Sequence, residues 1–153
     1  MRQQTEQEVL KRLTALCARG EHCAYEMREK MRRWDVDEEV QQRVVSYLEQ
    51  HHFIDEERYC RAFVNDKLTY NRWGRRKVEQ ALYAKRISAE VQRRVLDEVS
   101  GEDYVAQLRP LLEAKSKSVK AENDYERRTK LIRFALSRGF TMDIILDVLD
   151  SLS

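Results

Sequence analysis

The chain has 153 residues, of which 37% are charged and 42% are hydrophobic, and its formal net charge is only +2. This length suits one domain or one row of small stacked units, and the charge balance excludes a uniformly basic nucleic-acid-binding protein. Four glycines and one proline leave few residues that interrupt a helix, so we predict an all-α fold built from amphipathic helices.

An apolar pattern recurs three times, offset by 51 residues (Met27 to Val78) and then by 53 (Val78 to Leu131). Its internal spacing of three and four residues is that of a buried helical stripe. The three sets are Met27, Met31, Val36, Val40, Val44, Val45 and Leu48; Val78, Leu82, Ile87, Val91, Val95, Leu96 and Val99; and Leu131, Ala135, Phe140, Ile144, Val148, Leu149 and Leu152. We expect Ile87, Val91, Val95 and their counterparts to be buried, and Val91→Asp to cost several kcal/mol.

The predicted helices fall into three tandem three-helix repeats, 1–53, 54–100 and 101–153. In chain order they are 5–18, 22–33, 38–51, 56–69, 74–85, 89–99, 102–119, 125–138 and 142–151. Because each repeat is too small to cover its own core, stacking predicts an elongated array, whose curvature the sequence leaves open. Pro110 either kinks the seventh helix or marks its start, and residues 115–123 are expected to form a basic loop.

Helix starts also recur. Asp37, Ser88 and Thr141 occupy equivalent positions, and their side-chain oxygens are predicted to cap the last helix of each repeat. Asp55 marks a further start, where Ile54 can pack on Tyr59 as a hydrophobic staple.

Cys17, Cys23 and Cys60 form an odd set without a CxxC pair, which predicts free structural thiols in a reducing compartment. A metal site built from Cys17, Cys23, His22 and the His51–His52 pair would match no known ligand spacing, so no metal is expected. The sequence has no run of about 18 apolar residues and no apolar signal region, so we expect a soluble, cytoplasmic protein.

Catalytic motifs are missing from the sequence: it contains no glycine-rich phosphate loop, GxSxG, HExxH or Asp-x-Asp pattern. His22, His51 or His52 could each act as a base, but no nucleophile is identifiable beside them. We therefore predict a protein without catalytic activity and without a cofactor.

Charge is segregated along the chain. Eight acids and one base, Arg43, lie between Asp35 and Glu57, whereas eight bases and two acids lie between Arg61 and Ile87. The basic stretch also carries aromatic residues, and this combination suits either phosphates and bases or an acidic protein surface. For Trp73 we favour a packing role at a helix junction over a binding role.

The candidate partner-binding or DNA-binding residues are the bases of this stretch and of a second basic set. They are Lys67, Arg72, Arg75, Arg76, Lys77, Lys85, Arg86, Lys115, Lys117, Lys120, Arg127 and Arg128, with Lys130 beside the last two. Because Gly74 carries no side chain, we also predict that the start of the fifth helix is free to approach an anionic partner, with Arg75 and Arg76 as its cations.

Several segments resemble the RecX family of bacterial recombinase regulators. The central ones are Phe53-Ile54-Asp55-Glu56-Glu57-Arg58-Tyr59-Cys60-Arg61-Ala62-Phe63-Val64, Arg72-Trp73-Gly74-Arg75-Arg76-Lys77-Val78 and Arg86-Ile87-Ser88. Outer segments at residues 25–31 and 130–140 are similar too, so the resemblance spans about residues 8–150. The sequence departs from the family pattern at two turns, with His52 where a glycine is frequent and Trp34-Asp35 where a Lys-Gly pair is common.

The resemblance implies a three-repeat helical protein that binds the RecA filament on single-stranded DNA along its groove. It also implies that the protein restrains filament growth, ATP hydrolysis, strand exchange and co-protease activity in recombination and DNA repair, and has some DNA affinity of its own. The sequence alone leaves open a helix-turn-helix DNA-binding module, or a solenoid scaffold for another partner. Against the first, acids such as Glu38, Asp143 and Asp147 would repel phosphate from the last helix of a repeat. A monomer is expected.

Overall fold

The computed structural model describes residues 4–152, which form nine helices and no strand. The helices are α1 (Glu6–Arg19), α2 (Ala24–Arg33), α3 (Glu38–Gln50), α4 (Glu56–Thr69), α5 (Arg75–Ala84), α6 (Ala89–Leu96), α7 (Gly101–Ser118), α8 (Asp124–Ser137) and α9 (Met142–Leu152). The predicted all-α architecture is therefore confirmed, with most helix ends within three residues of their predicted positions.

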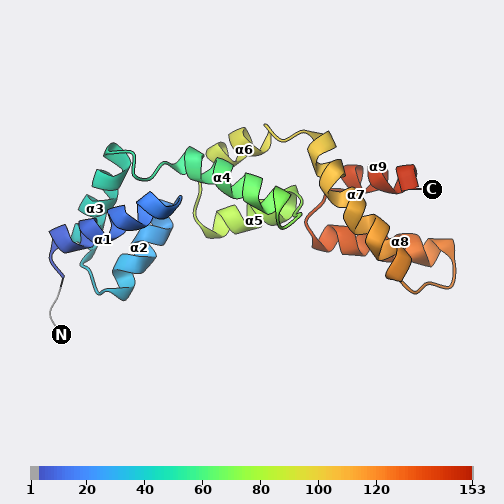
Figure 1. The fold of residues 1–153 in the computed structure, drawn as a ribbon, viewed down its shortest axis with the longest axis horizontal. Helices are drawn as coiled ribbons and strands as arrows, with labels where there is room; N and C mark the ends of the chain where they lie inside the picture. The colour runs from blue at the N-terminus through green and yellow to red at the C-terminus, as the bar shows by residue number, and fades with distance from the viewer. Residues whose placement is uncertain (1–3, 153) are drawn as a thin grey trace.

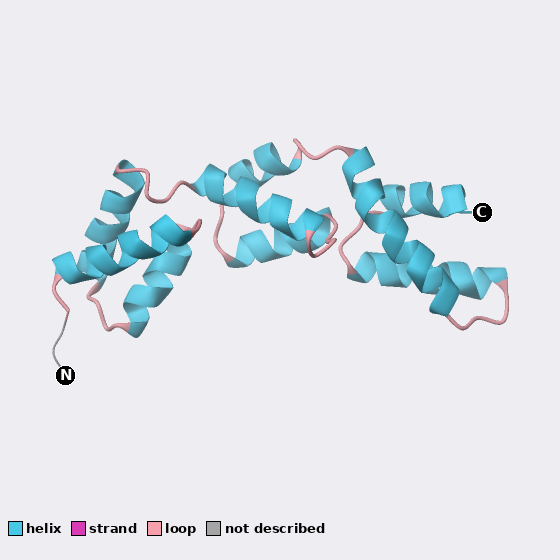
Figure 2. Ribbon diagram, in the orientation of Figure 1, coloured by secondary structure: helices cyan, strands magenta, loops and turns pink. Residues whose placement is uncertain are grey.

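Three groups of three helices lie one after another in an elongated row (Figure 1). The start of the described chain lies at one end of the row and the C-terminus at the other, and short loops join the helices of each group (Figure 2). We call the groups α1–α3, α4–α6 and α7–α9 the first, second and third units. The predicted boundaries between repeats, at 53/54 and 100/101, stay predictions.

Each unit has its own apolar core, formed by the repeated stripes together with the first helix of the unit. The largest fully buried side chains include Leu13, Met27 and Met31 in the first unit, Leu82 and Leu96 in the second, and Leu108, Phe140 and Ile145 in the third. The cores also borrow residues from their neighbours: Ile54 packs into the first core, Cys23 into the second and Leu68 against the third. The units thus stack through shared apolar contacts.

The expected burial of the stripe holds only in part. Ile87 and Val95 are buried, but Val91 is half-buried at the edge of the second core. Its first-unit counterpart Val40 is also half-buried, and so is Val36, the counterpart of the buried Ile87. The start of the last helix therefore lies at the rim of the core in these units, whereas the equivalent Phe140 and Ile144 of the third unit are enclosed.

The predicted helix caps are confirmed at two positions and wrong at a third. Asp55 accepts a hydrogen bond from the Arg58 backbone N–H at 2.9 Å, and Ser88 accepts one from Val91 at 3.3 Å. Asp37 precedes α3, but its side chain makes no cap hydrogen bond. The Thr141 hydroxyl is hydrogen-bonded to the Asp143 carboxylate.

Helix α7 continues through Pro110 and begins nine residues before it, at Gly101, so Pro110 does not mark its start. Both Pro110 and Ala106 are exposed, so water can satisfy the carbonyl that loses its helical donor. The helix also continues to Ser118, which confines the predicted loop of 115–123 to residues 119–123.

A left-handed residue recurs in the turn before the last helix of each unit. The φ angles of Asp35, Arg86 and Gly139 are 56°, 60° and 93°, and these positions are related by the same offsets as the apolar stripes. His52, at the end of α3, has φ 59°. The two departures from the family pattern, Asp35 and His52, are therefore side-chain-bearing residues in a conformation that favours glycine.

We expect Val95→Asp to lower the free energy of unfolding by about 3–5 kcal/mol, because it places an unpaired charge in the second core. Val91→Asp should cost only about 1–2 kcal/mol, since the carboxylate can reach water from the rim. Denaturant titration of both variants measures the two costs. Equal costs would show that the rim position is as closed as the core position.

His52→Gly should raise the free energy of unfolding by about 0.5–1 kcal/mol, because it relieves the left-handed strain of a residue with a Cβ. The neighbouring His51 has φ −96°, so His51→Gly is a matched control that should be destabilising. Thermal or denaturant unfolding compares the two variants. A loss of stability in His52→Gly would contradict the assigned backbone strain.

Candidate partner-binding surface

The second and third units meet through their backbones. The Gly74 N–H donates to the Arg138 carbonyl at 2.8 Å, and the Arg76 N–H donates to the Gly139 carbonyl at 3.0 Å. A Cβ on Gly74 would lie 2.3 Å from the Phe140 nitrogen. The N-terminal end of α5 is therefore occupied by the α8–α9 turn, and the prediction that this end is free to bind an anionic partner is wrong.

The contact is tight from the other side as well, because a Cβ on Gly139 would lie 2.4 Å from the Lys77 Cβ. Two glycines thus allow two backbones to approach more closely than any other residue pair would permit. Arg72 adds a side-chain link by donating to the Gln107 carbonyl of α7 at 3.3 Å. These contacts fix the second and third units against each other.

The first and second units use the equivalent positions but meet through side chains. Cys23 and Lys85 correspond to Gly74 and Arg138, and here the Cys23 thiol lies 3.9 Å from the Lys85 carbonyl. Glu26 holds the contact: it accepts hydrogen bonds from the Cys23 N–H at 3.1 Å, from Lys85 Nζ at 3.0 Å and from the Tyr59 hydroxyl at 3.4 Å. A hollow of about 500 Å³ lies in this junction, lined by residues of both units.

The surroundings of Glu26 hold it ionised. Burial raises the pKa of this carboxyl, but the hydrogen bonds from Lys85 and from the Cys23 N–H, with the charge of Lys85, outweigh burial and bring the pKa below its ordinary value. Burial raises the pKa of the Tyr59 hydroxyl, so this group stays protonated and can donate to Glu26.

Four of the predicted site residues serve as internal ties. Arg72 and Lys85 join units as described, and Arg127 donates to the Ser116 carbonyl at 2.6 Å. Arg75 pairs with Glu79 at 3.0 Å and with Asp97 at 2.9 Å. These cations are already neutralised or hydrogen-bonded, which weakens their candidacy as binding residues.

Other predicted residues stay at the surface. Arg76, Lys117 and Lys120 are exposed, and so are Arg86, whose guanidinium lies 5.3 Å from the Tyr25 ring centre, and Arg128, which lies 3.8 Å from Asp150. The remaining three, Lys67, Lys77 and Lys115, are half-buried because each lies over an aromatic ring.

On each side of the tight junction of the second and third units, two cations lie over one aromatic ring. Lys67 and Lys77 each lie 4.9 Å from the Trp73 ring centre, on the second unit. On the third unit, Lys115 and Arg138 lie 5.2 and 5.4 Å from the Phe134 ring centre. The Lys77–Gly139 contact joins the two halves. We call this set the basic–aromatic strip: Lys67, Trp73, Lys77, Arg138, Phe134 and Lys115.

At its third-unit end the strip borders a shallow hollow of about 380 Å³. The hollow is lined by Lys115, Val119, Lys130, Arg133 and Phe134. Its walls therefore combine three cations with two apolar side chains, a composition that suits either a phosphate-bearing chain or an acidic peptide.

Sequence reasoning did not include Phe134 and Arg138 among the site residues. The internal repeat could have identified Arg138, because Arg138 is the third-unit equivalent of Lys85, which is among the predicted binding residues. Trp73 has the packing role predicted for it, lying against the second core, while two lysines cover its ring.

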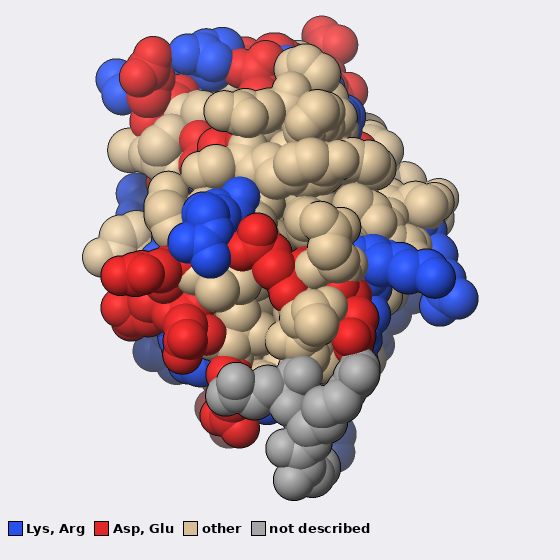
Figure 3. All heavy atoms as spheres, turned by 90° about the vertical axis from the view of Figure 1, so that its left-hand side faces the viewer, with Lys and Arg blue, Asp and Glu red and all other residues tan. Residues whose placement is uncertain are grey.

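The acidic stretch 35–57 is spread over the first unit and the start of α4. Seen end-on from the first unit, acidic side chains gather in the lower half of the face and a broad uncharged area lies above them (Figure 3). On α4, Glu57 pairs with Arg94 of α6 and lies 3.6 Å from Arg61. Glu57 of this stretch is thus neutralised within the chain.

Among residues 4–152, no three His, Cys, Asp or Glu side chains come together in a group that could hold a metal ion. Cys17, Cys23 and Cys60 are free thiols, and burial raises the pKa of Cys60 to about 11, so this thiol stays protonated. No helix in the described part of the chain is both long and apolar enough to cross a bilayer.

The fold and the surface define a class of protein: an array of three-helix repeats with a basic, aromatic surface across two of them. Models of the three RecX domains match this array unit by unit, the first three-helix domain at residues 14–48, the second at 55–96 and the third at 102–149. The chain belongs to the RecX family.

Individual relatives agree with this assignment. Regulatory protein RecX of Clostridium botulinum (strain Alaska E43 / Type E3) is 34% identical over 128 residues, covering 80% of this chain and 58% of the relative's length. Regulatory protein RecX of Acinetobacter baylyi is 30% identical over 132 residues, covering 86% of this chain and 80% of the relative. The crystal structure of RecX from Lactobacillus salivarius has the same fold, with a TM-score of 0.87 over 96% of both chains at 17% identity.

Glu26→Gln should destabilise the first junction at neutral pH and not in acid. Because the folded-state pKa of Glu26 lies below its ordinary value, its ionisation stabilises the fold above that value, and this stabilisation is lost as the pH falls through the lowered pKa. Thermal unfolding between neutral pH and about pH 3 should show the wild-type and variant curves converging. The exposed Glu113→Gln is the control. A difference in melting temperature between the wild type and Glu26→Gln that stays constant with pH would contradict the lowered pKa of Glu26.

Proposed function

We propose that this chain binds the RecA filament on single-stranded DNA and negatively regulates recombination and DNA repair by occupying the filament groove. The observation that carries this proposal is the basic–aromatic strip, which crosses a junction held rigid by Gly74 and Gly139. A rigid strip keeps its cations and rings in register with a repetitive partner and loses little entropy on binding.

The chemistry of the strip suits both components of such a filament. Lysine and arginine side chains pair with phosphates and with carboxylates, and aromatic rings add apolar contact area or stack on bases. The same chemistry supports a weaker affinity of the chain for bare DNA.

The elongated row of units supports groove binding over end binding. A rod laid along a helical groove contacts several recombinase subunits at once, so weak contacts add up and the occupied groove excludes a second DNA strand. Such occlusion accounts for reduced strand exchange, ATP hydrolysis and co-protease activity without any catalytic group in the regulator. The relatives above are named regulatory proteins, which supports a non-enzymatic role in the cytoplasm.

A helix-turn-helix mode of DNA reading is less well supported. It would place α3, α6 or α9 in a DNA groove, but α9 carries Asp143, Asp147 and Asp150 and no basic residue. Carboxylates along a recognition helix repel the phosphate backbone, whereas the strip lies on other helices.

Co-sedimentation with pre-formed RecA filaments, and with bare single-stranded DNA in the same buffer, tests the proposal. The wild-type chain should sediment with filaments at a lower concentration than with bare DNA. Lys67→Ala combined with Lys115→Ala should weaken filament binding by about tenfold, and less so at high salt, where screening reduces the electrostatic part.

Lys11→Ala combined with Arg19→Ala removes the same charge from exposed positions of the first unit and serves as the matched control. Both pairs should leave the melting temperature nearly unchanged, since none of the four residues belongs to a core. Equal filament affinity of the two double variants would show that the strip is a solvated face, and no filament binding by the wild-type chain would refute the proposed function.

A further inference from the structure

A hollow of about 300 Å³ lies where the third unit meets the second. It is lined by apolar and polar side chains of both units, among them Arg75, Val99, Tyr104, Phe140, Thr141 and Ile144. Figure 1 shows the starts of α7 and α9 on the side of the third unit that faces the second. Because Arg75 and Lys77 are two residues apart on α5, about 200° around the helix, the hollow and the basic–aromatic strip lie on different sides of that helix.

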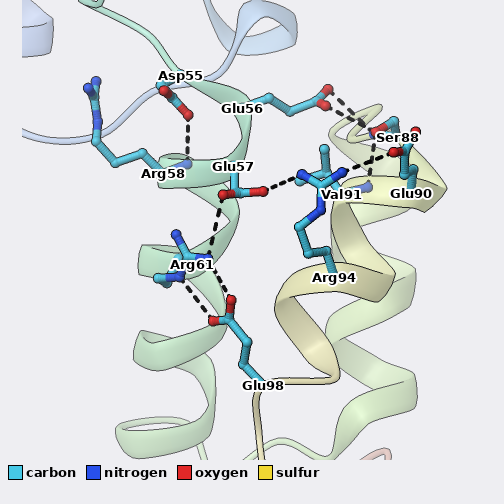
Figure 4. A network of polar contacts seen from close by, with 10 residues as sticks. All are labelled: Asp55, Glu56, Glu57, Arg58, Arg61, Ser88, Glu90, Val91, Arg94 and Glu98. Atoms are coloured by element: carbon cyan, nitrogen blue, oxygen red, sulfur yellow. Dashed lines mark hydrogen bonds and ion pairs between the residues drawn. The ribbon is translucent and has the colours of Figure 1, made fainter.

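The second unit has a carboxylate at the equivalent place. Glu56, the first residue of α4, accepts hydrogen bonds from the Ser88 hydroxyl at 3.1 Å and from the Ser88 N–H at 3.4 Å. Figure 4 shows this carboxylate reaching across to the start of α6. An acceptor on the first helix of the unit thus satisfies two donors at the start of its last helix.

In the third unit a phenol replaces that carboxylate. The offset of 48 residues between the buried Cys60 and Leu108 puts Tyr104 at the position of Glu56, and the stripe offset of 53 puts Thr141 at the position of the serine. Tyr104 is 7% exposed, and its hydroxyl makes no hydrogen bond with any residue of 4–152. The Thr141 hydroxyl bonds to a carboxylate of its own helix, and its N–H has no acceptor in the described chain. Two donors at this hollow therefore have no acceptor within those residues.

The Tyr104 hydroxyl is a donor throughout the neutral range. Burial raises the pKa of this group to about 12, so it keeps its proton. A buried donor without an acceptor costs stability, and a ligand that supplies the acceptor recovers that cost on binding. The hollow is therefore suited to a ligand that brings an oxygen acceptor.

The charges around the hollow disfavour a carboxylate or a phosphate as that acceptor. Arg75 is already paired with Glu79 and Asp97. Asp143 also lines the hollow, and the hydrogen bond from the Thr141 hydroxyl lowers the pKa of its carboxyl, so it is ionised. An anion would be repelled, whereas the carbonyl of an amide accepts hydrogen bonds without adding charge.

We infer that the hollow receives an asparagine or glutamine side chain of a protein partner, whose amide carbonyl accepts hydrogen bonds from the Tyr104 hydroxyl and the Thr141 N–H. The amide NH₂ donates to Asp143, and the aliphatic part of the side chain packs on Phe140 and Ile144. The amide thus takes the role that a carboxylate of the chain itself has in the second unit. The inference rests on the proposed function for the partner's identity, a recombinase subunit of the filament.

Tyr104→Phe tests the inference because it should act in opposite directions on stability and binding. In the isolated chain it removes a buried donor that has no acceptor, so the melting temperature should not fall and should rise by up to about 2 °C. Filament affinity should fall by about fivefold, because the partner's amide loses a buried hydrogen bond. Tyr125→Phe removes the same hydroxyl from an 81% exposed ring and is the matched control, which should change neither quantity.

Gly101→Leu tests the hollow by filling it. Gly101 lines the hollow, and a Cβ there would lie 3.7 Å from Ile144 Cδ1, an ordinary van der Waals contact, so the fold should accept the side chain. Filament affinity should fall by about tenfold at an undiminished melting temperature, because the leucine takes the room of the partner's side chain. Gly20→Leu is the matched control, since a Cβ on Gly20 meets nothing within 4 Å.

The outcomes separate the inference from the proposed function. If the wild-type chain binds filaments and Tyr104→Phe binds as tightly, the hydroxyl does not meet the partner and the inference is overturned. A lower melting temperature for Tyr104→Phe would overturn it independently of any partner, because the hydroxyl would then have an acceptor in the free chain. If the wild-type chain fails to bind filaments, the proposed function is refuted, and the recombinase is excluded as the source of the amide.

Discussion

The close approach of two backbones, at Gly74 and Gly139, is the constraint on which the rest of the binding surface depends. It brings the start of α5 within hydrogen-bonding distance of the α8–α9 turn and thereby places Lys77 beside Arg138. The rings of Trp73 and Phe134, which belong to different units, acquire a common border of cations as a consequence. Without this contact the strip would be two separate patches, each with one ring.

The junction of the first and second units uses the equivalent positions but different chemistry, so the two junctions respond differently to pH. There Cys23 stands where Gly74 stands, its side chain keeps the backbones apart, and a single carboxylate, Glu26, gathers the donors that join the units. Backbone hydrogen bonds between Gly74 and Arg138 do not titrate, whereas the Glu26–Lys85 pair does. The backbone contact between the second and third units is therefore insensitive to pH, whereas part of the contact between the first and second units depends on the ionisation of Glu26.

Sequence periodicity predicted the nine helices well because a buried stripe is a local signal, repeated here three times. The periodicity did not predict features that depend on residues distant in the sequence. Nothing near Gly74 in the sequence indicates that the turn at Arg138 will cap that helix, and nothing near Val91 indicates that it lies at the rim of its core. The candidate cations were found by charge alone, but charge does not reveal that Arg75 and Arg127 are already engaged inside the chain.

Comparison of the units with one another separates residues required by the fold from residues free to serve a partner. The left-handed turn residue is kept in all three units although its identity changes from Asp35 to Arg86 to Gly139, so the backbone conformation is what the fold requires. The arginine tie is kept in two units and is absent from the third, where Asp147 stands at the position of Arg94 and Val105 at the position of its partner Glu57. Both members of the pair differ together, so the third unit loses the tie and does not set Asp147 against a carboxylate at the position of Glu57. The ion pair is therefore not a requirement of every three-helix unit, whereas the left-handed turn is kept in all three.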